Sequence, residues 1–110
     1  MPAIVAYSHS SLDIFLARPA ATIIGELTTS GTGVEGAQLD AWHEQICFLK
    51  SALEGFERPA HIYFEFFIPR MGKRVDVVLL VENAVVVLEF KVHSKTFDMA
   101  AIDQAHDYAL

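Results

Sequence analysis

An α/β fold is predicted by three features of this 110-residue chain: an amphipathic helix, three β-rich segments after it, and a helical pattern at the end. Apolar residues recur at intervals of three and four between residues 39 and 53, which places them on one helix face. The β-rich segments then follow one another directly. This order predicts a sheet covered by helices on both faces.

The long helix is predicted to begin at a capping box and to end near Gly55. Thr32 would cap the main chain, and Glu35 would reach back to it. We assign the whole apolar stripe to the core, and it consists of Leu39, Trp42, Ile46, Leu49 and Leu53.

Two shorter helices are expected between Ser10 and Leu27, with a break at Pro19. Their inward residues would be Leu12, Phe15, Leu16, Ile23, Ile24 and Leu27. A Gly, Thr and Ser segment at 28–33 separates them from the long helix. The sequence therefore predicts an N-terminal helical segment over 1–31, packed on a core domain over 32–110.

Strands are predicted at 61–68, 74–81 and 84–92, where aromatic and β-branched residues dominate. Glu82 and Asn83 form a two-residue turn, so Val81 should pair with Ala84. In this register Asp76 lies opposite Glu89, and the two carboxylates share a face.

Two facing carboxylates in Val-rich strands repel each other, by roughly 0.2–1 kcal/mol at an exposed site. A divalent cation between them would reverse the sign of this interaction. Oxygen ligands suit Mg²⁺ or Mn²⁺. Lys91 shares the face of Glu89 and could position a water molecule or stabilise charge on a phosphate. The alternative is that both acids lie in solvent and pair with Arg74 and Lys91.

Composition limits the classes of partner. The net charge of −6 argues against broad non-specific binding to nucleic acid, yet five of the eight Lys and Arg residues lie within 70–95. No apolar run is long enough for a membrane span. The single cysteine, Cys47, fits a reducing cytoplasm.

A last helix is expected to begin at Asp98 and to be still in progress at Leu110, so the fold would be cut off before its final strand. Gln104 and Tyr108, four residues apart, would share one face of this helix.

These motifs resemble the PD-(D/E)XK nuclease superfamily, whose restriction-endonuclease-like core is αβββαβ. That family has an Asp on the second strand and Glu-x-Lys on the third, matched here by Asp76 and by Glu89, Phe90 and Lys91. The resemblance implies that the Phe90 carbonyl is a further metal ligand. Gln104 is similar to the residue that RecB-like members place beside the active site.

The run FEFFIPRMGKRVDVVLL also resembles the N-terminal nuclease-like domain of uncharacterised bacterial DNA/RNA helicase-like proteins, which implies a helicase region in the full-length protein. The superfamily often adds a Glu from the first helix. Glu35 and Glu44 are the candidates here, and Glu65 is a third. Whether Glu65 shares the face of Asp76 depends on the turn after Pro69.

The predicted function is Mg²⁺-dependent cleavage of DNA or RNA phosphodiester bonds. Asp76 and Glu89 would hold the metal, Lys91 would orient the water, and Gln104 would assist. The residues expected to contact nucleic acid are Arg70, Lys73, Arg74 and Tyr108. Two alternatives remain: an inactive nucleic-acid-binding module with the same fold, and a homodimer formed through an exposed sheet edge.

Overall fold

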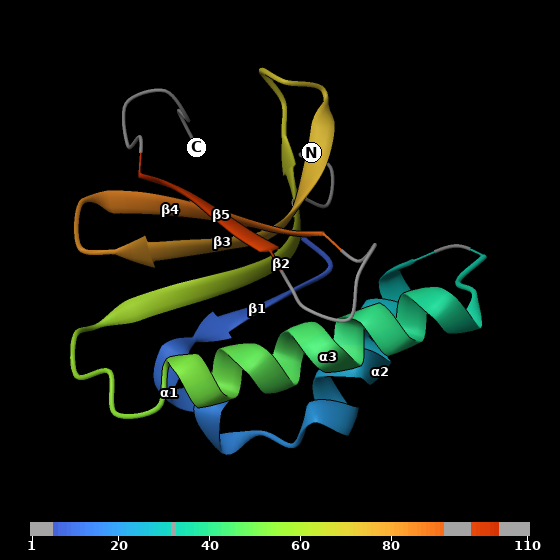
Figure 1. Cartoon of the computed structure of the whole chain (residues 1–110), viewed down its shortest axis with the longest axis horizontal. Helices are drawn as coiled ribbons and strands as arrows, with labels where there is room; N and C mark the ends of the chain where they lie inside the picture. Colours follow the sequence, from blue (N-terminus) through green and yellow to red (C-terminus); the bar gives the residue numbers. More distant parts are fainter. Residues whose placement is uncertain (1–5, 32, 92–97, 104–110) are drawn as a thin grey trace.

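The computed structural model describes residues 6–31, 33–91 and 98–103, and the side chains of Lys91 and of 98–103 lie outside this description. The elements are β1 (Ser8–Ser11), α1 (Leu12–Ala17), α2 (Ala20–Ser30), α3 (Gly36–Ala52), β2 (Ala60–Ile68), β3 (Lys73–Val81), β4 (Ala84–Lys91) and β5 (Asp98–Asp103). The strands form one antiparallel sheet in chain order. The three helices lie together below this sheet (Figure 1). The fold is therefore α/β, with N-terminal helices followed by four antiparallel strands that β1 joins at one edge.

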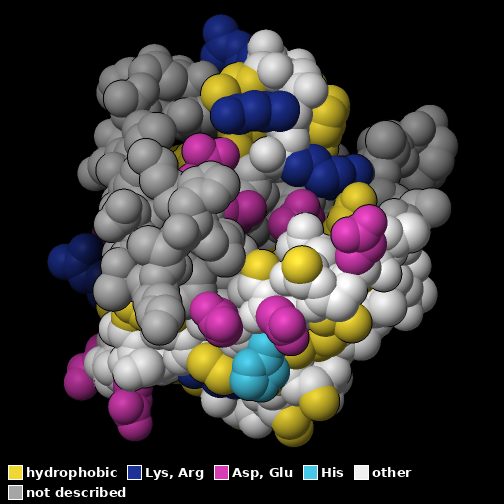
Figure 2. All heavy atoms as spheres, turned by 45° about the vertical axis from the view of Figure 1, so that its right-hand side comes forward, with side chains coloured by type: hydrophobic (Ala, Val, Ile, Leu, Met, Phe, Trp, Pro, Cys, Tyr) yellow, Lys and Arg dark blue, Asp and Glu magenta, His cyan; other side chains and the backbone are white. Residues whose placement is uncertain are grey.

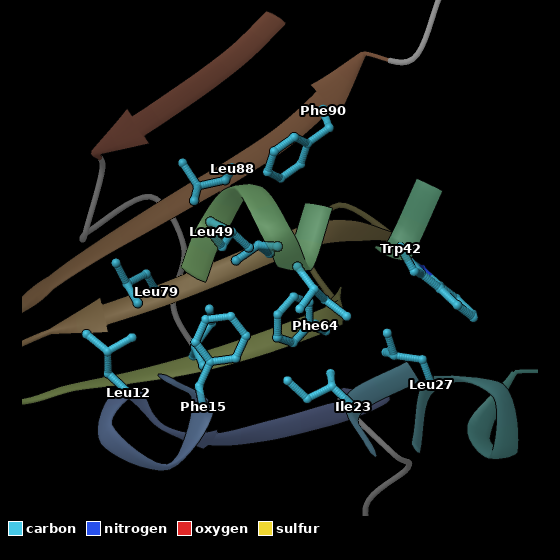
Figure 3. Packing of buried hydrophobic residues seen from close by; sticks show 13 residues of the cluster. Leu12, Phe15, Ile23, Leu27, Trp42, Leu49, Phe64, Leu79, Leu88 and Phe90 are labelled. Atoms are coloured by element: carbon cyan, nitrogen blue, oxygen red, sulfur yellow. The ribbon is translucent and has the colours of Figure 1, made fainter. Parts of the chain in front are cut away.

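The main core lies between the helices and the sheet (Figure 3). As predicted, α3 buries Trp42, Ile46 and Leu49, while Leu39 and Leu53 pack partly buried at its ends. The two short helices bury apolar side chains in the same cluster, namely Leu12, Phe15, Ile23 and Leu27. Helices α1 and α2 thus share one core with α3 and the sheet.

The boundaries of α2 and α3 differ from the prediction. Helix α2 continues through Thr28 and Thr29, whose hydroxyls donate to carbonyls one turn back and so remain compatible with the helix. Helix α3 begins at Gly36, with Glu35 as its N-cap residue and without a side-chain capping bond. The capping box is therefore wrong for Glu35, and Thr32 lies outside the described residues.

Strand β1 was not predicted. Its sequence, Ser-His-Ser-Ser, lacks the apolar alternation of a strand, yet Ser8 pairs with Phe64 and Ser11 with His61. An edge strand needs to fill only one set of main-chain hydrogen bonds and can remain polar. Strand β1 therefore forms because the apolar strand β2 offers main-chain hydrogen bonds along its edge.

The predicted β3–β4 register is confirmed. Val81 pairs with Ala84, and the pairing continues to Val77 and Leu88. Side chains that point to the helices belong to the main cluster, and the alternate ones form a second cluster on the other face with Phe66 and Ile68. Both faces of these strands are therefore apolar, as the sequence predicts.

The last helix is not formed where it was predicted. Residues 98–103 form β5, which pairs antiparallel with β4 from Lys91–Asp98 to Val86–Asp103. Without β5 the Val-rich β4 would be an open edge, and pairing that edge outweighs the N-cap preference of Asp98. In the described part of the chain, helices cover only one face of the sheet. Gln104 and Tyr108 lie outside the described residues.

Within the described ranges, no helix combines the length and apolar character that crossing a membrane requires.

Lys50 of α3 holds the end of α1. Its ammonium group donates to the carbonyl oxygens of Phe15, Leu16 and Arg18, and it lies 4.7 Å from the centroid of the Phe15 ring. The last carbonyls of a helix have no partner within the helix, and a lysine near them also suits the helix dipole. Burial lowers the pKa of Lys50 below its ordinary value.

We expect Lys50→Met to destabilise the fold by about 1–3 kcal/mol, because it leaves half-buried carbonyls without donors. Urea unfolding measures the change. The matched control is Glu44→Ala, an exposed position of the same helix that should stay within about 0.5 kcal/mol of wild type. Equal effects of the two substitutions would contradict this role for Lys50.

Candidate functional site

Three acidic residues occupy one row across the three central strands. Pairing of Phe64 with Val77 and of Phe66 with Val75 places Glu65 of β2 beside Asp76 of β3. The β3–β4 register places Glu89 one step beyond its last recorded pair, next to Asp76. The turn after Pro69, which the sequence left open, therefore brings Glu65 into the row.

The backbone is unusual at this row. Glu65 has φ +54, a left-handed conformation that is uncommon for a non-glycine residue within a strand. The side chains before and after the row point to opposite faces of the sheet. Phe64 and Val77 belong to the helix-side cluster, whereas Phe66 and Val75 belong to the second cluster on the other face. Val75 and Val77 therefore lie on opposite faces of the sheet, although the regular alternation of a strand would place them on one face. The far end of the β2–β3 hairpin rises away from the sheet (Figure 1).

Asp76 interrupts the main-chain ladder. Its carboxylate oxygen Oδ2 accepts the main-chain N–H of Phe90 at 2.7 Å, in the place that a carbonyl of the neighbouring strand would take. Burial raises the pKa of Asp76, and the nearby Glu89 raises it further. The Phe90 hydrogen bond and Lys73 act in the opposite direction.

Glu65 is held by the long helix. The indole Nε1–H of Trp42 donates to its carboxylate at 3.2 Å, and Arg74 donates to its main-chain oxygen at 2.9 Å. Burial raises the pKa of Glu65, and the charge of Asp76 adds to this rise, while Trp42 and Arg74 oppose it. Trp42, assigned to the core from its spacing alone, therefore also orients an acid of the row.

Two basic residues of the hairpin lie beside the acids. Lys73 Nζ is 3.8 Å from Glu89 Oε2, with both side chains about half exposed. Arg74 lies over the ring of Tyr7, 4.4 Å from its centroid, while it binds Glu65. Lys73 therefore places a positive charge at Glu89, and Arg74 fixes the strained main chain.

Gln45 is a polar residue inside the apolar stripe of α3. It is 3% exposed, and its Oε1 has no hydrogen-bond partner in the described part of the chain. Trp42, one turn earlier, reaches Glu65 on β2, and Phe48, one turn later, contacts Phe90 on β4 at 5.9 Å between ring centroids. Gln45 lies between these contacts on the helix surface and therefore faces β3. The sequence signal was a Gln at a stripe position.

The helix acids proposed from the sequence do not join the row. Glu44 is exposed on α3. Glu35 is exposed at the start of α3, where it lines a pocket of about 510 Å³ together with Tyr7, Trp42 and Glu65. Arg70 is exposed at the tip of the β2–β3 hairpin. Lys91 ends β4, but its side chain lies outside the described residues, as do Gln104 and Tyr108.

The donor chemistry of the row fits a hard divalent cation, because carboxylate and amide oxygens are its preferred ligands. Among the described residues, however, no three His, Cys, Asp or Glu side chains lie together closely enough to hold a metal. Mg²⁺ typically keeps several waters and needs only one or two carboxylates. Asp76 and Glu89, with Gln45 facing the same strand, satisfy that smaller requirement.

Figure 2 shows acidic side chains inside a hollow of the surface, with Lys and Arg side chains above it and further acidic side chains below it. Positive charge on one side of these carboxylates would attract an anionic ligand while the acids hold a cation.

No family model, curated protein or solved structure matches this chain.

The acid row should reduce stability at neutral pH. A carboxyl whose pKa is raised on folding stabilises the fold fully below its unfolded-state pKa, and this contribution is lost as pH rises through the folded-state value. Asp76→Asn removes the charge and keeps an oxygen for the Phe90 N–H. Like charges across strands cost about 0.2–1 kcal/mol, so we expect the Tm to rise by a few degrees at neutral pH.

Calorimetry from neutral pH down to about pH 4 tests this expectation, since the advantage of the variant should vanish where Asp76 is protonated. The matched control is Glu57→Gln, an exposed acid outside the row, which should change the Tm little. A lower Tm for Asp76→Asn at neutral pH would contradict the repulsion.

Proposed function

We propose that this chain is a nuclease-type domain that uses Mg²⁺ or Mn²⁺ to hydrolyse phosphodiester bonds of DNA or RNA. The observation that carries the proposal is the row of Glu65, Asp76 and Glu89. A strained residue and half-buried charges are costly to maintain in a small domain, and such costs concentrate at functional sites.

Asp76 and Glu89 would hold the metal, and the resemblance implies the Phe90 carbonyl as a further ligand. Gln45 Oε1 is a buried oxygen without a hydrogen-bond partner in the described part of the chain. A metal ion held there would supply Lewis-acid activation. Glu65 would accept a proton from the attacking water, since burial raises the pKa of its carboxyl above the ordinary value. Lys91 would orient the attacking water, and Gln104 would lie beside the active site, as the resemblance implies.

The basic residues of the hairpin support an anionic substrate. Lys73 is exposed beside Glu89, Arg70 is exposed at the tip of the same hairpin, and Arg74 is half-buried between Tyr7 and Glu65. We assign Arg70 and Lys73 to contacts with the nucleic-acid backbone and Arg74 to the support of the site. Tyr108 would be a further contact with nucleic acid, as expected from the sequence. A helicase region in the full-length protein would bind a longer stretch of the nucleic acid.

A second candidate is a nucleic-acid-binding module that has lost cleavage. It is favoured by the finding that the described residues gather no three metal-binding side chains. Such a module would bind DNA or RNA equally well in EDTA, and its affinity would fall with salt as phosphate contacts are screened.

Calorimetric titration of Mg²⁺ and Mn²⁺ tests the metal site. We expect the wild-type chain to bind the ions, and Asp76→Asn and Glu89→Gln to lower the metal affinity more than about tenfold. Substituting a residue that only hydrogen-bonds to a metal ligand already lowers metal affinity about 10–100-fold. Glu44→Gln is the matched control and should bind like wild type.

Cleavage of end-labelled single- and double-stranded DNA and RNA then tests the reaction. Metal-dependent cleavage that is lost in Glu89→Gln supports the nuclease. Wild-type protein that is folded, takes up no divalent cation and binds nucleic acid in EDTA would replace the proposal with the binding module.

A further inference from the structure

A cluster of three rings lies at the β1–β2 edge of the sheet, away from the acid row. His9 of β1 pairs with Tyr63 of β2, and Ser11 pairs with His61. His9 Nδ1 and His61 Nε2 are 3.1 Å apart. The Tyr63 ring packs against both imidazoles, with centroids 5.4 Å from His9 and 5.0 Å from His61. Tyr63 packs on the second apolar cluster, so these rings occupy the face opposite the helices.

The two imidazole nitrogens have the spacing of two ligands of one metal ion. Bonds of about 2.0–2.1 Å in a tetrahedral site place neighbouring nitrogens about 3.3 Å apart. At 3.1 Å the two nitrogens form a hydrogen bond, so a metal ion would replace the shared proton, and their separation would change by a few tenths of an ångström to reach that geometry. His9 is exposed and His61 half-buried, so an ion can approach from solvent, and water can fill its remaining positions.

The backbone already restricts both side chains. They come from directly paired strands, and the Tyr63 ring supports each imidazole. Glu26, an acid beside β1, is held by Ser8 and Arg18, so its oxygens serve those partners. Imidazole suits Zn²⁺, Ni²⁺ and Cu²⁺, whereas Mg²⁺ prefers oxygen. The chemistry therefore separates this cluster from the acid row.

We propose that His9 and His61 form a two-nitrogen site for a divalent transition-metal ion of the Zn²⁺, Ni²⁺ or Cu²⁺ type. The ion clamps the edge strand β1 to β2. Tyr7 directly precedes β1, and its ring lies under Arg74, which donates to the main-chain oxygen of Glu65. Holding β1 in place therefore also holds Tyr7, Arg74 and the main chain at Glu65. Metal binding at this site does not require the proposed nuclease activity.

Thermal unfolding and calorimetric titration with Zn²⁺ and Ni²⁺ test the clamp. We expect either ion to raise the Tm of the wild-type chain by several degrees, because it binds the folded state, and Mg²⁺ not to do so through this site. His9→Gln and His61→Gln should each lose the shift and at least tenfold in affinity.

His43→Gln is the matched control, because it removes a histidine away from the sheet edge. His43 lies on α3 beside Cys47, with sulfur–nitrogen distances of 3.8 and 3.9 Å, so it also tests whether this pair binds the ion. It should keep the full shift. Loss of the shift in His43→Gln, or its survival in both edge-strand variants, overturns the proposal.

A measurement on the wild-type chain covers the case of a variant that does not fold. In NMR spectra, Zn²⁺ should shift the ring-proton signals of His9 and His61 together at one stoichiometric equivalent. Unchanged signals at saturating Zn²⁺ overturn the clamp, and neither result depends on whether Mg²⁺ binds the acid row.

Discussion

The hydrogen bond from the Phe90 N–H to the carboxylate of Asp76 shapes the central part of this molecule. A side chain here replaces the carbonyl acceptor that a regular antiparallel ladder would supply. The β3–β4 pairing is recorded up to Val77 and Leu88, and Glu89 lies beside the interruption. In the same row, Glu65 takes a left-handed conformation. The exchange of sheet faces and the upward bend of the hairpin both occur at this row.

Helix α3 makes the row possible by supplying polar groups from an otherwise apolar face. Trp42 has a large apolar surface and one N–H group, and it uses the N–H group to hold Glu65. Gln45 is buried between the helix contacts to β2 and β4 without a partner for its oxygen in the described part of the chain. At the position of Gln45 an aliphatic side chain would stabilise the core more, because it would leave no buried oxygen without a partner. A stability cost at such positions is understandable if the polar atoms serve a ligand.

The raised pKa values of Glu65 and Asp76 have the same origin. Both carboxylates lose water on folding, and each lies near another acid. Lys73 and Arg74 compensate only in part, because Lys73 meets Glu89 at a half-exposed site where an ion pair contributes little. Residual negative charge in a half-buried row is the electrostatic condition that a divalent cation relieves.

Local chemistry predicted much of the fold and part of the site. The apolar stripe of α3, the break at Pro19 and the two-residue turn at Glu82 and Asn83 depend on near neighbours, and the turn fixed which residues of β3 and β4 pair. The position of Asp76 next to Glu89 therefore followed from the sequence. The start of α3 was predicted too early, because a plausible capping box did not reveal that Glu35 is itself the cap residue.

The sequence by itself determined the helix faces, the central hairpin and two acids of the row, since each depends on residues close together along the chain. Only the tertiary structure decided the third acid, because the placement of Glu65 needs the turn after Pro69 and a strained φ. It also decided the pairing of β1 and β5, since an edge strand forms in response to a distant partner. The contacts of Trp42 with Glu65 and of His9 with His61 join residues far apart in sequence, and folding alone brings them together.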